Sequence, residues 1–310
     1  SLRDPTSPHR GEVKKEWLGI TAKPCLQAPM TAPPTAAQLI EQGLYHHRQG
    51  DFSQAMDRYT QVLRNDPKNP DALYYVAVLA CHEGQFQQGI DLARRSLSFR
   101  PGQARAHNLI GQALHRMGQV KDALASFDDA LACDPKFADA YGNRANMLSE
   151  LGRPAEALSS FDRAIALNPN AAIDWLNRGA TLHSLGRVDD AIASYDKAIA
   201  LDPYFPVPHL NRASVLNDLG RWADAVAGYD GVIALEPKFA EAHLGRAVAL
   251  KGLARLDEAL ASADRALELK PESVPAHKCR ASILQALGRA EEAKASLAKA
   301  AEIEANTSST

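Results

Sequence analysis

The sequence has few aromatic residues and no excess of charge of either sign. Phe, Trp and Tyr make up 6% of the 310 residues, and 35 Lys and Arg are set against 37 Asp and Glu, for a net charge of −2. Such a balance gives no bulk field that would attract nucleic acid or an anionic membrane, so we expect neither as a partner. No apolar run reaches about 18 residues, so no segment is expected to span a bilayer.

Cysteine and catalytic motifs are scarce as well. The four cysteines never fall in a CxxC spacing, which indicates reduced, structural thiols in a reducing compartment and therefore a cytoplasmic protein. There is no phosphate-binding loop, no nucleophile beside a base and no pair of carboxylates at catalytic spacing. We therefore predict no catalytic residue, no cofactor and no enzyme activity.

The first 35 residues differ from the rest of the chain. They hold six prolines and show no sustained apolar periodicity, so residues 1–35 are predicted to be a disordered N-terminal arm. Met30 stands six residues before the regular part of the sequence begins, and we expect it to be the natural start.

From residue 36 onward the sequence repeats itself every 34 residues. Eight copies fill residues 36–307, which leaves a tail of residues 308–310, and the copies begin at Ala36, Pro70, Ala104, Ala138, Ala172, Pro206, Ala240 and Val274. Apolar residues recur at intervals of three and four within each copy, so two amphipathic helices per copy are predicted. A fixed period of this length is typical of a solenoid, which grows as one continuous array.

The residues of the fourth copy carry a family resemblance. Its pattern consists of an aromatic, a small residue, a leucine, a turn glycine, a second helix and a closing proline: Tyr141, Ala145, Leu148, Gly152, Ala157, Phe161, Ala164 and Pro169. This pattern resembles the tetratricopeptide repeat. The resemblance implies an all-α, right-handed superhelical solenoid of about eight helix-turn-helix repeats, with the first helices lining a concave groove. The seventh copy departs from the pattern, because Ala254 replaces the turn glycine.

Small residues recur where the two helices of a copy are expected to cross. Positions 8 and 20 of all eight copies hold only glycine or alanine, Ala145 and Ala191 among them. Two helices can approach closely only where neither carries a large side chain. Enlarging such a residue is expected to overpack the helix pair.

Arginine recurs at position 7 and aspartate at position 25. Pairing them within one copy would leave Asp128 and Arg280 without partners, whereas pairing each aspartate with the arginine of the next copy leaves none. We therefore predict inter-repeat ion pairs that join each second helix to the next first helix. The alternative is that both residues lie on solvated faces. The five predicted pairs are Asp128–Arg144, Asp162–Arg178, Asp196–Arg212, Asp230–Arg246 and Asp264–Arg280.

Asparagine recurs at position 6 in three consecutive first helices, as Asn143, Asn177 and Asn211. These residues resemble the asparagine ladder of the tetratricopeptide repeats in O-linked N-acetylglucosamine transferases, which holds peptide backbone. An amide suits that role because it offers both a donor and an acceptor. The alternative is a common repeat residue with a local role. Four further polar residues complete the predicted peptide-binding groove: Asn108, Gln112, Asn146 and Asn217.

Histidines at repeating positions do not predict a metal site. His47, His115 and His183 share position 12, but the first two lie two repeats apart, and a metal needs three or four ligands that converge. The sequence therefore predicts a scaffold that binds a protein or an extended peptide in its groove. One alternative is a detached substrate-recognition module of an O-linked N-acetylglucosamine transferase-like system, without a catalytic domain. Another is a self-assembling structural solenoid.

Overall fold

The computed structural model describes residues 33–307, and every regular element in that range is an α-helix. Of the predicted arm, residues 1–32 lie outside the described range, as do Met30 and the tail of residues 308–310, whereas Thr35 is described and caps the first helix through the Gln38 backbone N–H. The first helices of the eight repeats are α1 (Ala36–Arg48), α3 (Pro70–His82), α5 (Ala104–Arg116), α7 (Ala138–Glu150), α9 (Ala172–Ser184), α11 (Pro206–Asp218), α13 (Ala240–Gly252) and α15 (Val274–Ala286). The second helices are α2 (Phe52–Asn65), α4 (Phe86–Phe99), α6 (Val120–Cys133), α8 (Pro154–Leu167), α10 (Val188–Leu201), α12 (Trp222–Leu235), α14 (Leu256–Leu269) and α16 (Ala290–Thr307).

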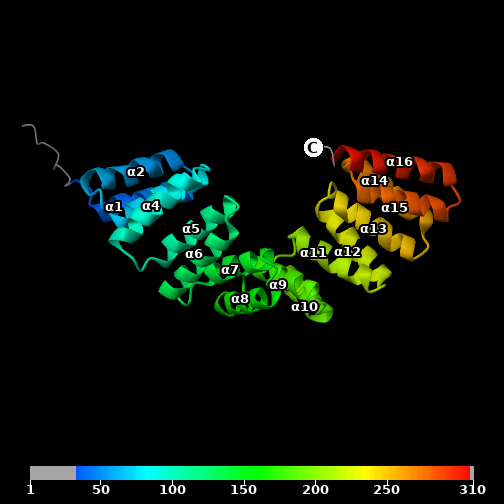
Figure 1. Ribbon diagram of the computed structural model, residues 1–310, viewed down its shortest axis with the longest axis horizontal. Coiled ribbons are helices and arrows are strands. Elements are labelled where there is room, and N and C mark those ends of the chain that lie inside the picture. The colour runs from blue at the N-terminus through cyan, green and yellow to red at the C-terminus, as the bar shows by residue number, and fades with distance from the viewer. Residues whose placement is uncertain (1–32, 308–310) are drawn as a thin grey trace, which may run out of the picture.

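The helix pairs are stacked in chain order along an arc (Figure 1). Each helix packs most extensively on the other helix of its own repeat and next on the helix that adjoins it in the neighbouring repeat. The pairs α1–α2 and α15–α16 form the two ends of the arc, and α7 to α10 lie at its middle (Figure 1). This arrangement confirms the predicted fold class, an all-α right-handed superhelical solenoid.

The turn between the two helices of a repeat requires a left-handed backbone. Seven glycines at this place have φ between 70° and 81°. Glycine adopts this conformation without strain, whereas the Cβ of any other L-residue approaches the following carbonyl oxygen. Ala254 takes the same turn with φ of 58°, and it is the one non-glycine residue of positive φ within residues 33–307. The seventh repeat therefore keeps the fold with a strained residue.

In five of the eight repeats the core contains a buried aromatic ring of the second helix at position 24: Tyr59, Phe127, Phe161, Tyr195 and Tyr229. Tyr195 is 1% exposed, and a Cβ added at Gly179 would lie 2.6 Å from its Cε1 atom. The same relation holds between Gly111 and Phe127, where the distance to the ring is also 2.6 Å. Small residues at position 8 therefore let the ring of the second helix reach the backbone of the first, as the sequence pattern predicted.

Candidate functional site

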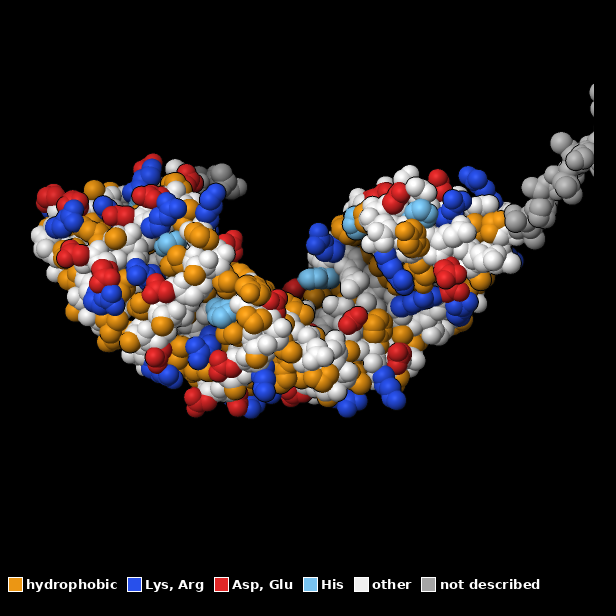
Figure 2. All heavy atoms as spheres, turned by 180° about the vertical axis from the view of Figure 1, so that it is seen from behind, with side chains coloured by type: hydrophobic (Ala, Val, Ile, Leu, Met, Phe, Trp, Pro, Cys, Tyr) orange, Lys and Arg blue, Asp and Glu red, His pale blue; other side chains and the backbone are white. Residues whose placement is uncertain are grey.

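Three adjoining hollows follow the first helices of repeats two to five. The first, here the α3–α5 hollow, has a volume of about 280 Å³; the second, the α5–α7 hollow, about 260 Å³; and the third, the α7–α9 hollow, about 740 Å³. Gln112 and Arg116 line both the first and the second, and His115 and Asn146 line both the second and the third. Because neighbouring hollows share walls, they form one continuous depression, which we call the groove. The molecule is visibly hollowed along its inner side, with acidic and basic side chains intermixed over the face in view (Figure 2).

Two amide pairs bridge neighbouring first helices. Asn143 Nδ2 donates to Asn108 Oδ1 at 3.0 Å, between α7 and α5, and Asn177 Nδ2 donates to Asn146 Oδ1 at 3.1 Å, between α9 and α7. Each pair fixes the orientation of its donor amide. The carbonyl oxygens of Asn143 and Asn177 remain available, since an amide has two donor hydrogens and two acceptor lone pairs.

The seven residues predicted for the groove fall into three groups. Gln112, Asn143, Asn146 and Asn177 line the hollows. Asn108 is only 8% exposed and serves as the acceptor beneath Asn143. Asn211 and Asn217 lie on α11 and line none of the three hollows.

The two asparagines of α11 have local surroundings of their own. The Asn211 side chain is hydrogen-bonded to the hydroxyl of Tyr195, and burial raises the pKa of that tyrosine to about 12 in spite of this bond. Asn217 Oδ1 is buried without a hydrogen-bond partner. Asn211 therefore lies beside the buried phenol of Tyr195 and outside the groove.

All five Asp–Arg pairs between neighbouring repeats are formed in the structure. In each pair the arginine Nε atom lies 2.6–2.7 Å from the aspartate Oδ1 atom. The aspartate side chains are 44–53% exposed and the arginine side chains 22–34%. Ion pairs of this exposure contribute up to about 1 kcal/mol each, because water screens them.

A serine that sequence reasoning missed completes four of these contacts. Arg144 Nη1 donates to Ser160 Oγ at 2.6 Å, and Arg178 Nη1 donates to Ser194 Oγ at 2.7 Å. Arg246 and Arg280 repeat the contact with Ser262 and Ser296. In the sequence this contact corresponds to a serine at position 23, two residues before the position-25 aspartate of the same repeat.

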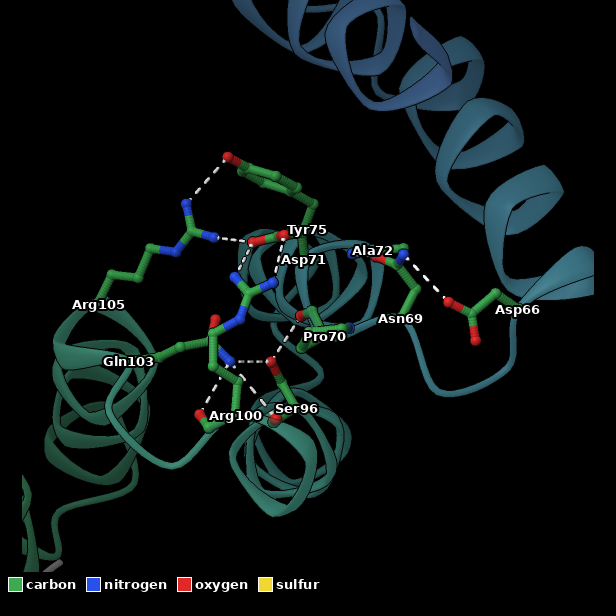
Figure 3. Close-up of polar contacts among 10 residues, drawn as sticks. All are labelled: Asp66, Asn69, Pro70, Asp71, Ala72, Tyr75, Ser96, Arg100, Gln103 and Arg105. Carbon is green, nitrogen blue, oxygen red and sulfur yellow. Dashed lines mark hydrogen bonds and ion pairs between the residues drawn. The ribbon is translucent and has the colours of Figure 1, made fainter. Parts of the chain in front are cut away.

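The joint between the second and third repeats uses a different charge cluster, which the sequence analysis did not identify. Arg100 donates from Nη1 and Nη2 to the two carboxylate oxygens of Asp71, at 2.9 and 3.0 Å. Arg105 binds the same carboxylate and also donates to the Tyr75 hydroxyl at 3.1 Å (Figure 3). The Arg105 guanidinium lies 4.5 Å from the centre of the Tyr74 ring. The Asp71 carboxylate thus binds two guanidinium groups, that of Arg100 in the turn after α4 and that of Arg105 on α5.

Asp174 is an unpaired carboxylate at the joint between the fourth and fifth repeats. Its Oδ1 atom lies 2.7 Å from the place where a Cβ on Gly142 would be, so α9 rests against the bare backbone of α7. The side chain is half-buried and has no hydrogen bond or ion pair with any residue of the described range. Burial, and secondarily the charge of Asp139, raises the pKa of Asp174 to about 6.

The histidines at position 4 have structural contacts. The Nε2 atoms of His209, His243 and His277 donate to the carbonyl oxygens of the closing prolines of the preceding repeats at 2.9–3.1 Å, and Trp175 makes the equivalent bond to Pro169. Within residues 33–307, no three His, Cys, Asp or Glu side chains are grouped so that they could hold a metal ion. In the same range, no helix is both long and apolar enough to cross a membrane.

Comparison with protein-family models identifies the repeat. Five models, all described as tetratricopeptide repeat, match the chain and together cover residues 46–206, 210–274 and 280–307. No curated protein sequence matches the chain.

Solved structures share the fold at low sequence identity. PilF of Pseudomonas aeruginosa is 22% identical with a TM-score of 0.62, and the match covers 70% of this chain and 98% of that one. YrrB is 20% identical with a TM-score of 0.52, over 59% of this chain and 95% of that one. A chain of the APC/C hetero-tetramer Cut9–Hcn1 is 18% identical with a TM-score of 0.60, over 87% and 53%. The finer resemblance to O-linked N-acetylglucosamine transferases gains no support from these matches.

Proposed function

Because the chain belongs to the tetratricopeptide repeat family, we propose that it is a protein–protein interaction scaffold that holds an extended segment of another protein in the groove. The observation that carries this proposal is the pair of oriented amides, Asn143 and Asn177, on the walls of a continuous groove. YrrB, one of the proteins of similar fold, is described as a TPR protein with an unusual peptide-binding site. The scaffold performs no chemistry of its own.

The groove is suited to backbone recognition. The carbonyl oxygens of Asn143 and Asn177 accept from peptide N–H groups, and the remaining amide hydrogens donate to peptide carbonyls. A neutral hydrogen bond contributes only about 0.5–1.5 kcal/mol after desolvation. Recognition of this kind gives modest affinity and tolerates many side chains, which is the behaviour of a scaffold with several partners.

The test compares two asparagine variants of the full chain. A random dodecapeptide library displayed on phage supplies ligands for the wild type, and the affinities of the recovered peptides are then measured as synthetic peptides. Asn143→Ala combined with Asn177→Ala should weaken binding about tenfold while the melting temperature stays close to that of the wild type. Asn211→Ala is the matched control, because Asn211 occupies the same repeat position but lines none of the hollows. Unchanged affinity in a folded double variant would end the proposal.

A further inference from the structure

The groove contains one guanidinium that no carboxylate neutralises. Arg116, at the end of α5, is exposed and forms no ion pair with a described residue, and its guanidinium lies 5.8 Å from the centre of the Phe86 ring. The position-7 arginines of the first helices are instead paired with aspartates, as Arg144 and Arg178 are. The Phe86 ring limits the freedom of the Arg116 side chain by a cation–π contact. Arg116 is therefore a positioned, exposed positive charge that has no carboxylate partner among the described residues.

The two hollows that contain Arg116 have no acidic residue in their walls: no Asp or Glu lines the α3–α5 hollow or the α5–α7 hollow. The α7–α9 hollow has Glu150 in its wall, and this carboxylate is 2.8 Å from His115 Nε2. The walls of the first two hollows therefore carry one formal positive charge, that of Arg116, and no negative charge, although the whole chain has a net charge of −2.

We infer that the segment held in the groove carries a side-chain carboxylate that pairs with Arg116. A planar guanidinium matches a carboxylate through two parallel hydrogen bonds, and the neutral amides of Gln112 and Asn143 beside it keep the backbone in place. This inference rests on the proposed function, and it adds the class of partner, an acidic segment.

The α3–α5 hollow adds a second requirement beside the charge. Phe86, Leu109 and Ala113 give this hollow an apolar floor, next to Arg116 in the same wall. In an extended peptide, side chains at i and i+2 point to the same side. An acidic residue on Arg116 therefore places the side chain two positions away in the apolar hollow. The expected ligand has one apolar and one acidic residue with a single residue between them.

The experiment uses the full chain and the same random dodecapeptide phage library. Panning is performed on the wild type, on Arg116→Gln and on Arg94→Gln. Arg94 is an exposed arginine of α4 that has no ion pair within the described residues and lines none of the three hollows, so its loss changes the net charge equally. Recovered peptides are synthesised with amidated C-termini, which removes the chain-terminal carboxylate, and each is paired with its Glu→Gln or Asp→Asn version.

We expect a preference for acidic peptides that depends on Arg116. Peptides from the wild type and from Arg94→Gln should be enriched in an acidic residue two positions from an apolar one. Replacing that acid should weaken binding to the wild type about fivefold, the upper range for an exposed ion pair, and leave binding to Arg116→Gln unchanged. The inference is overturned by peptides without acidic enrichment, by preference for a free C-terminus over the side-chain acid, or by an equal effect on both proteins. If the recovered peptides contain no acidic residue but depend on Asn143 and Asn177 for binding, this inference is wrong and the proposed function still holds.

Discussion

Replacement of Asp174 by asparagine should make the array more stable at neutral pH and leave its stability unchanged below pH 3.8. In the folded chain the pKa of Asp174 is raised from 3.8 to about 6, chiefly because the carboxylate is buried without a donor. The folded state therefore holds this proton more tightly than the unfolded state. The stabilisation is complete below pH 3.8 and is lost as the pH rises through 6. Above about pH 7 the unpaired charge destabilises the fold by its full amount.

The size of the effect follows from the same shift. A change from 3.8 to about 6 corresponds to a ceiling of about 3 kcal/mol at 1.36 kcal/mol per pKa unit. Solvent reaches the half-buried side chain and screens it, so about 1 kcal/mol is the expected difference. Asparagine keeps the shape of the side chain without the charge. Five other repeats have a fully buried alanine at this position, which shows that the joint needs no acid: Ala72, Ala106, Ala140, Ala242 and Ala276.

The assay is urea unfolding of wild type and Asp174→Asn, followed by circular dichroism, at half-unit steps from about pH 3 to pH 8. The difference in unfolding free energy should be near zero below pH 3.8, grow as the pH rises towards 6, and level off at about 1 kcal/mol above that pH. Amide exchange in α7 and α9 should localise the gain to that joint. Asp189→Asn removes an exposed charge from α10 and controls for net charge. A difference that does not depend on pH would refute the reasoning.

The same joint gives a second, steric test. The new Cβ of Gly142→Ala would lie 2.7 Å from Asp174 Oδ1, the end of a side chain that can rotate away, while alanine gains about 1 kcal/mol over glycine inside a helix. The two effects oppose each other, so the variant should lie within about 1 kcal/mol of the wild type, whereas in an Asp174→Ala background the same change should stabilise the chain by about 1 kcal/mol. Equal effects in the two backgrounds, measured by urea unfolding, would show that the two residues do not interact.

Three further outcomes are expected in urea unfolding. Ala254→Gly should stabilise the array by about 1 kcal/mol, because it relieves the strain of a φ of 58°. The control, Ala261→Gly in the exposed helix interior of α14, should destabilise the array by about the same amount. A loss of stability in Ala254→Gly would contradict this reasoning. A double-mutant cycle of Asp162→Asn and Arg178→Gln should give a coupling below about 1 kcal/mol, and a value of 3 kcal/mol would mean that the pair is not screened. Ala191→Leu should cost roughly 1–3 kcal/mol by overpacking a fully buried crossing, and a neutral result would show a cavity there.

The fold could be predicted because its signals are local and repeated. Gly152 and Pro169 fix where helices break and end, and the helices α7 and α8 end within two residues of these signals. The ion pairs could also be predicted, since the choice between two registers depended only on counting which residues would lack partners. Asp128 and Arg280, at the two ends of the series, decided the register without any coordinates.

The candidate site was less accessible to prediction because its geometry depends on contacts between repeats. Nothing in the spacing of Asn143 and Asn108 distinguishes a bonded pair from two separate groove residues. Asn211 shares its repeat position with Asn177, yet Tyr195 gives it a different partner. The cluster at Asp71 leaves only a weak periodic signal, because the Arg100–Asp71 pair recurs once, as Lys270–Glu241 in the seventh repeat.

The inter-repeat ion pairs have a consequence for how the number of repeats can change. In each repeat from the fourth to the eighth, the position-7 arginine pairs with an aspartate of the preceding repeat. The fourth to seventh repeats also supply an aspartate to the arginine of the following repeat. Removal of residues 172–205, one whole period, would place Arg212 sixteen residues after Asp162, the same separation as in every existing pair. Unequal crossing-over between repeat-encoding segments therefore produces longer or shorter arrays with no orphaned charge. In this way the chain can change the length of its array in steps of 34 residues, and each new joint is assembled from residues already present.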